Sequence, residues 1–164
     1  MSGKVSVHDG FLEAIDPVWD DISKTLEEVK CPIFYTGHSL GAALATLAAA
    51  RSRVPQALYT FGSPLVGNQA FVDTLNNVAI YRVVDDEDLV TVVPPEILGF
   101  RHVGELHKLK PLVPETLTPL ELKLKELALS VLNLPPISFK DFDLEFPPKI
   151  LADHAPINYI ERLT

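Results

Sequence analysis

The first apolar pattern in the sequence is typical of an amphipathic helix. Apolar residues recur at steps of three and four, at Phe11, Ile15, Trp19, Ile22, Leu26 and Val29. Asp16 followed by Pro17 has the form of an N-cap with proline at the first helical position. The pattern therefore predicts one helical face that restarts near Pro17.

Short apolar runs follow, rich in β-branched and aromatic residues and closed by glycine or aspartate, which is typical of buried strands. They are "CPIFYTG" from residue 31, "ALYTFG" from residue 57 and "VAIYRVV" from residue 78, with "FRHVGEL" from residue 100 as a fourth candidate. Helical stretches separate the first three, from Leu40 to Arg53 and from Asn68 to Leu75. Alternating strands and helices predict an α/β fold with a parallel sheet of four to five strands.

Prolines become frequent after residue 110, at Pro111, Pro114, Pro119, Pro135, Pro136, Pro147 and Pro148. Between them lies "TPLELKLKELALSVLN", which opens with a capping box of Thr118 and Glu121 and is predicted as a helix. Much of this stretch also alternates between apolar and polar residues, as a strand would. Its widely spread apolar residues and mixed charges favour a helix that covers the core over one that lies at a membrane interface. "APINYIERL", residues 155–163, is predicted as a closing helix.

Composition narrows the class of protein. With 164 residues, 47% of them hydrophobic, the chain suits one globular domain over residues 1–164. A net charge of −8 argues against nucleic acid and against simple electrostatic attachment to anionic membranes. The single cysteine, Cys31, excludes an internal disulfide and a Cys-rich metal site. No signal peptide and no run of about 18 apolar residues is visible. A cytoplasmic protein without a transmembrane segment is therefore expected.

The pentapeptide G-H-S-L-G, Gly37 to Gly41 with His38 at its second position, points to chemistry. A nucleophilic serine needs a sharp turn between strand and helix, and glycines keep side chains out of that turn. Ser39 occupies the serine position between a predicted strand and a predicted helix. The N–H of Leu40 is then aimed at a developing oxyanion. The alternative is a glycine-rich turn with a serine cap.

A nucleophilic serine needs a base, which is oriented by an acid. Where the serine lies on such a strand-to-helix turn, the acid follows it in the chain and the histidine follows the acid. His102 lies in a strand-like run, and His107 soon after it. His154 lies just before the closing helix, on a loop that suits a base reaching across the sheet, so spacing favours it over His102. The acid should follow a strand, and four carboxylates satisfy this equally, namely Asp85, Asp86, Glu87 and Asp88.

Taken together, these stretches resemble the class 3 lipases, the fungal-type triacylglycerol lipases of the α/β-hydrolase fold. The matching segments, in the family's order, are "VHDGF", "YTGHSLGAALATLAA", "LYTFGSPLVGN", "YRVVDDEDLVTVVPP", "FRHVGE" and "DHAPINYIERL". The resemblance implies a serine esterase that acts on acylglycerols or related lipid esters through an acyl-enzyme, with no metal and no organic cofactor. Ser39 then matches the family's nucleophile, Asp88 its acid and His154 its base, whereas His8 and His102 match structural motifs.

The chain departs from the family pattern in two places. Leu65 follows "GSP", where the family usually has arginine. The family's earlier strands, lid region and first oxyanion loop have no counterpart before "VHDGF", which leaves Leu40 as half of an oxyanion hole. A non-catalytic lipase-like module is therefore the rival hypothesis. The apolar serine strand would also have an unpaired edge, so self-association or a partner chain is expected there.

Overall fold

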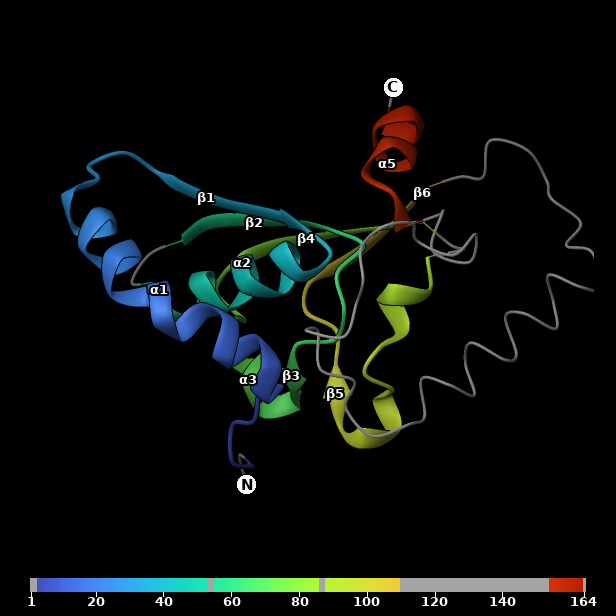
Figure 1. The fold of residues 1–164 in the computed structure, drawn as a ribbon, viewed down its shortest axis with the longest axis horizontal. Coiled ribbons are helices and arrows are strands. Elements are labelled where there is room, and N and C mark those ends of the chain that lie inside the picture. The colour runs from blue at the N-terminus through green and yellow to red at the C-terminus, as the bar shows by residue number, and fades with distance from the viewer. Residues whose placement is uncertain (1–2, 53–54, 86–87, 110–153, 164) are drawn as a thin grey trace, which may run out of the picture.

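A computed structural model describes residues 3–52, 55–85, 88–109 and 154–163 (Figure 1). The helix predicted over residues 118–133, with its membrane-interface alternative, falls outside these residues. Four strands form a sheet in the order β1-β2-β4-β6, and every neighbouring pair is parallel. Their bounds are Ile33–His38 for β1, Pro55–Phe61 for β2, Ala79–Asp85 for β4 and Glu105–Leu109 for β6. The predicted parallel α/β sheet is confirmed, and the carboxyl ends of its strands meet at one edge.

The first helix, α1 (Asp9–Glu28), is continuous, so the predicted restart at Pro17 is wrong. His8 caps it, because its Nδ1 accepts a hydrogen bond from the backbone N–H two residues ahead. Pro17 is exposed inside the helix, where water can reach the carbonyl that loses its donor. The carboxylate of Asp16 pairs with Arg51 at 2.5 Å instead of capping a helix.

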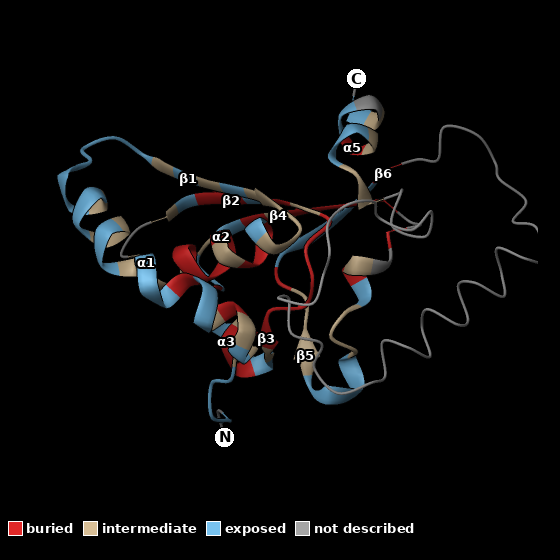
Figure 2. Ribbon diagram, in the orientation of Figure 1, coloured by how far each residue is buried: buried red, intermediate tan, exposed pale blue. Residues whose placement is uncertain are grey.

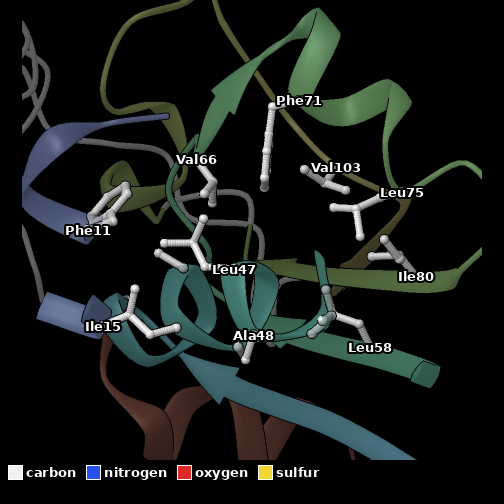
Figure 3. Close-up of a cluster of buried hydrophobic side chains, with 13 residues drawn as sticks. Phe11, Ile15, Leu47, Ala48, Leu58, Val66, Phe71, Leu75, Ile80 and Val103 are labelled. Atoms are coloured by element: carbon white, nitrogen blue, oxygen red, sulfur yellow. The ribbon is translucent and has the colours of Figure 1, made fainter. Parts of the chain in front are cut away.

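The alanine-rich helix α2 (Leu40–Arg51) packs on β1 and β2, and α1 packs on α2 (Figure 1). Small side chains let the helix lie close to the sheet, and most of α2 is buried (Figure 2). The main core lies between these layers (Figure 3), and its buried cluster includes Phe11 and Ile15 of α1, Leu47 of α2 and Leu58 of β2. The first amphipathic pattern therefore predicted the buried face at Phe11 and Ile15, whereas Trp19, Ile22 and Leu26 are half-buried and Val29 is exposed beyond the end of α1.

The fourth predicted strand is two strands. Phe100–Arg101 forms β5, which pairs antiparallel with β3 (Gly67–Asn68) in a separate two-stranded sheet, and only the residues after Gly104 join the main sheet as β6. Gly104 has a φ of +85°, and a Cβ there would lie 2.3 Å from the side chain of Ile80. The glycine therefore turns the chain between the two sheets at a point of close approach.

Shorter elements complete the described chain. The helix α3 (Gln69–Asp73) is capped by the Asn68 side chain, and two 3₁₀ turns, η1 (Leu89–Val92) and η2 (Glu96–Leu98), follow β4. Within the described residues, no helix is both long enough and apolar enough to cross a membrane.

The closing helix α5 (Pro156–Leu163) forms as predicted, on the face of the sheet opposite α2 (Figure 1). Its Tyr159 is buried against Val83 and Leu109 at the carboxyl ends of the strands. Elsewhere the same face is open: Phe34 of β1 is 59% exposed and Tyr59 of β2 is 39% exposed.

Candidate active site

Ser39 sits at the turn between β1 and α2 in a strained backbone conformation. Its φ of 57° and ψ of −128° make it the one non-glycine residue with positive φ among the described residues. Its N–H donates to the carbonyl of Phe61 at 3.0 Å, which ties the turn to the end of β2. Such strain costs about 1 to 3 kcal/mol and is typical of functional sites.

The two glycines around Ser39 differ in role. A Cβ at Gly37 would lie 2.2 Å from the carbonyl oxygen of Gly41, so any side chain at residue 37 collides with the first turn of α2. A Cβ at Gly41 would meet no atom within 4 Å. The sequence-based expectation that both glycines avoid a clash is therefore correct for Gly37 and wrong for Gly41, whose α carbon faces open space. As the first residue of α2, Leu40 has an N–H that the helix itself leaves without an acceptor.

Asp88 and His154, which are 66 residues apart in the chain, form a hydrogen bond of 2.8 Å between Oδ2 and Nδ1. The Asp88 side chain is fully buried, and that of His154 is 13% exposed. The other carboxylate oxygen, Oδ1, accepts from the N–H of Val90 at 2.9 Å. Because a carboxylate only accepts, Nδ1 of His154 carries a proton, and in the neutral ring Nε2 then presents a lone pair.

Tyr159 of α5 is a third partner of the carboxylate. Its hydroxyl donates to Oδ2 of Asp88 at 2.5 Å and accepts from the N–H of Asp85 at 3.2 Å. Burial, followed by the hydrogen bond to Asp88, raises the pKa of Tyr159 well above its ordinary value, so the hydroxyl keeps its proton. Arg162, one turn further along α5, forms an ion pair with the buried carboxylate of Asp85. These contacts hold α5, and the His154 segment before it, on the end of β4.

Gly62 belongs to the site, although its position in the sequence indicated only the end of a strand. It has a φ of +56°, and a Cβ there would lie 2.6 Å from Oδ2 of Asp88 and 3.0 Å from the His154 ring. Asp88 and His154 therefore pack against a residue that has no side chain. The signal in the sequence was a glycine directly after the strand that follows the serine turn and helix.

The structure joins two of the three expected triad residues. Nε2 of His154 is buried and has no hydrogen-bond partner within the described part of the chain, so no bond links it to Ser39. The ring of His154 nevertheless lies beside His38, the residue before Ser39, with ring centroids 4.5 Å apart. Asp88 and His154 are therefore paired next to the serine turn, but no hydrogen bond joins His154 to Ser39.

The remaining candidates have other surroundings. Asp85 is fully buried and pairs with Arg162, whereas Asp86 and Glu87 fall outside the described residues. His102 is not among the partners of the Asp88 carboxylate, and burial, with nearby Arg82, lowers its pKa to about 4. No group of histidine, cysteine, aspartate and glutamate that would hold a metal occurs among the described residues. Leu65, where the resemblance implies arginine, is 1% exposed and part of the core.

Solved lipase structures share the fold of this chain. The Rhizomucor miehei lipase in complex with its propeptide superposes with a TM-score of 0.61 at 32% identity, over 69% of this chain and 41% of that one. A triacylglycerol lipase whose catalytic centre is described as a serine protease triad superposes with a TM-score of 0.57 at 30% identity, over 66% of this chain and 47% of that one. The fold is that of the α/β-hydrolase lipases.

Among relatives by sequence, secreted mono- and diacylglycerol lipase 1 of Fusarium solani is 45% identical over 108 residues. The match covers 60% of this chain and 32% of that protein, so the chain spans about a third of its relative's length. The expectation of a cytoplasmic protein is wrong, because a relative of this kind is secreted and points to an extracellular location. A family model described as Lipase (class 3) matches residues 1–98, which is more than half of the sequence. The chain belongs to the class 3 lipase family.

Proposed function

We propose that the chain hydrolyses carboxylic esters of lipids through an acyl-enzyme. Nε2 of His154 takes the proton of Ser39 as its hydroxyl oxygen attacks the ester carbonyl, and Asp88 holds the resulting imidazolium. The Leu40 N–H stabilises the oxyanion. His154 then returns the proton to the leaving alcohol, and water releases the acid by the same steps. The chemistry needs no metal or organic cofactor.

The hydrogen bond between Asp88 and His154, beside a strained serine turn, is the observation that carries this proposal. It orients an imidazole with its basic nitrogen unprotonated, as general-base catalysis requires. Apo structures often show long or missing bonds between nucleophile and base, which tighten when substrate binds. The lack of a hydrogen-bond partner at Nε2 of His154 is therefore compatible with the mechanism.

A second candidate is a lipase-like module without catalysis. The missing bond between Ser39 and His154 favours it. A non-catalytic module would keep the acid–base pair for packing alone.

A fluorophosphonate probe separates the two candidates, because it labels only an activated serine. We expect labelling of the wild type, none of Ser39→Ala, and normal labelling of Ser23→Ala. Ser23 is a matched control because its hydroxyl bonds a carbonyl within α1. A wild type that neither labels nor hydrolyses a p-nitrophenyl ester would favour the non-catalytic module, and labelling of Ser39→Ala would refute the assignment of the nucleophile.

Lipid esters are proposed as the substrate class because relatives named as mono- and diacylglycerol lipase and as triacylglycerol lipase share the fold. Comparison of hydrolysis rates for emulsified acylglycerols and for soluble short-chain esters tests this choice. Equal or higher rates on soluble esters would indicate a general esterase.

We further propose that the exposed β1 edge associates with another chain or a second copy. Among the described strands β1 pairs only with β2, and Phe34, on the open face of the sheet next to this edge, is 59% exposed. Sedimentation of dilute protein, compared with Phe34→Ser, tests this. A wild type that sediments as a monomer at every concentration would refute it.

A further inference from the structure

His38 contacts the main chain of the proposed base. Its Nε2 lies 2.7 Å from the carbonyl oxygen of His154, across 116 positions of sequence. The centroids of the two imidazole rings are 4.5 Å apart, at an interplanar angle of 32°. The Tyr159 ring meets the His38 ring edge-on, with centroids 5.6 Å apart. The side chain next to the nucleophile therefore reaches the segment that carries the base.

The hydrogen bond identifies the tautomer of His38. A carbonyl oxygen only accepts, so Nε2 of His38 is the donor and carries a proton. Burial, and then the neighbouring His154, lower the pKa of His38, whose ring is consequently neutral at neutral pH. Nε2–H is thus the form of His38 that fits the site.

His154 is then held at two points by two different strands. Asp88, after β4, fixes the ring through Nδ1, and His38, at the end of β1, fixes the backbone through the carbonyl. The bond to the ring alone would leave the backbone of His154 unfixed, and the bond to the backbone alone would leave the ring free to rotate. The two bonds together hold both the ring and the backbone of His154 beside His38, which Ser39 follows directly.

We propose that His38 is a positioning residue for the base: as a neutral Nε2–H imidazole, it holds the backbone of His154 against the serine strand. This inference rests on the proposed role of His154 as base. The groups that face His38 are the His154 ring, the hydroxyl-bearing ring of Tyr159 and, through space, the Asp88 carboxylate. A neutral His38 also avoids repulsion when His154 becomes an imidazolium during catalysis.

A matched pair of substitutions tests the role of the N–H donor. His38→Gln keeps an N–H at a similar distance from the α carbon, and His38→Leu removes it. We expect His38→Leu to lower kcat by roughly tenfold to a hundredfold, the range for small misplacements of a catalytic group, with KM little changed. His38→Gln should recover most of that loss. His107→Leu, at an exposed histidine of β6, is the control and should retain wild-type kcat.

An NMR measurement decides the question without requiring activity. In the wild type we expect ¹⁵N shifts of a neutral Nε2–H His38 and a downfield proton on Nδ1 of His154. That proton should exchange faster in His38→Leu than in His38→Gln. A Nδ1–H tautomer of His38, or equal behaviour of the Leu and Gln variants in both kcat and exchange, would overturn the inference. If the wild type is inactive but proton exchange still differs between His38→Leu and His38→Gln, the proposed function is refuted and the positioning by His38 stands.

Discussion

Replacing Tyr159 by phenylalanine removes one oxygen atom from beneath the proposed acid. The hydroxyl donates to Asp88, whose side chain is fully buried, and accepts from the N–H of Asp85. The ring stays, so its packing against Val83 and Leu109 is preserved and no cavity term arises. The variant therefore isolates the two hydrogen bonds of the hydroxyl from the packing of the ring.

The expected loss of stability follows from the charge of the acceptor. A hydrogen bond to a charged group contributes about 1.5 to 3 kcal/mol, roughly twice a neutral bond, because the carboxylate cannot recover its hydration when buried. Asp88 retains Val90 and His154 as donors, so it stays paired. We expect Tyr159→Phe to lower the free energy of unfolding by about 2 kcal/mol at pH 7.

Urea denaturation followed by circular dichroism measures this difference. Tyr59→Phe is the control, because Tyr59 is 39% exposed and stacks on Tyr81 at 5.0 Å, so its change should lie within about 0.5 kcal/mol. The pKa of Tyr159 is raised by folding, so its contribution is complete below pH 10 and declines as the unfolded state ionises above that value. The gap between wild type and Tyr159→Phe should therefore narrow above pH 10. Equal losses for Tyr159→Phe and Tyr59→Phe would refute the argument.

Three further predictions concern glycines and a half-buried histidine. Gly37→Ala should destabilise the fold strongly in urea, because its Cβ meets the Gly41 carbonyl at 2.2 Å, whereas Gly41→Ala should be neutral or stabilise α2 by up to about 1 kcal/mol; similar losses would contradict the geometry. Gly62→Ala should cost about 1 to 2 kcal/mol from its positive φ and also displace Asp88, so probe labelling that matches wild type would contradict its place in the site. His102 has a folded pKa of about 4, below its unfolded value, so stability should fall by up to about 3 kcal/mol as pH drops from 6.5 to 4; a pH profile unchanged in His102→Gln would refute this.

Local signals in the sequence predicted the main elements of the fold. The apolar runs predicted β1, β2 and β4, and the alanine-rich stretch predicted α2 to within two residues of its end. Such signals succeed because strand burial and helix periodicity depend on neighbouring residues. The same reasoning failed at Pro17, where an N-cap pattern was outweighed by a helix already started at His8. It also merged β5 with β6, because the turn at Gly104 follows from the close approach of Ile80 in another strand.

The sequence by itself determined that Ser39 lies in a turn between a strand and a helix, because that turn is built from five adjacent residues. Spacing left the acid open among four carboxylates and favoured His154 over His102 without excluding either. The resemblance to the class 3 lipases selected Asp88 and His154. The tertiary structure shows how they meet and revealed Gly62 beside them, because the carboxyl ends of β1, β2 and β4 meet at one edge of the sheet. Contacts across 66 or 116 positions of sequence depend on strand order and on the packing of α5, which no local pattern encodes.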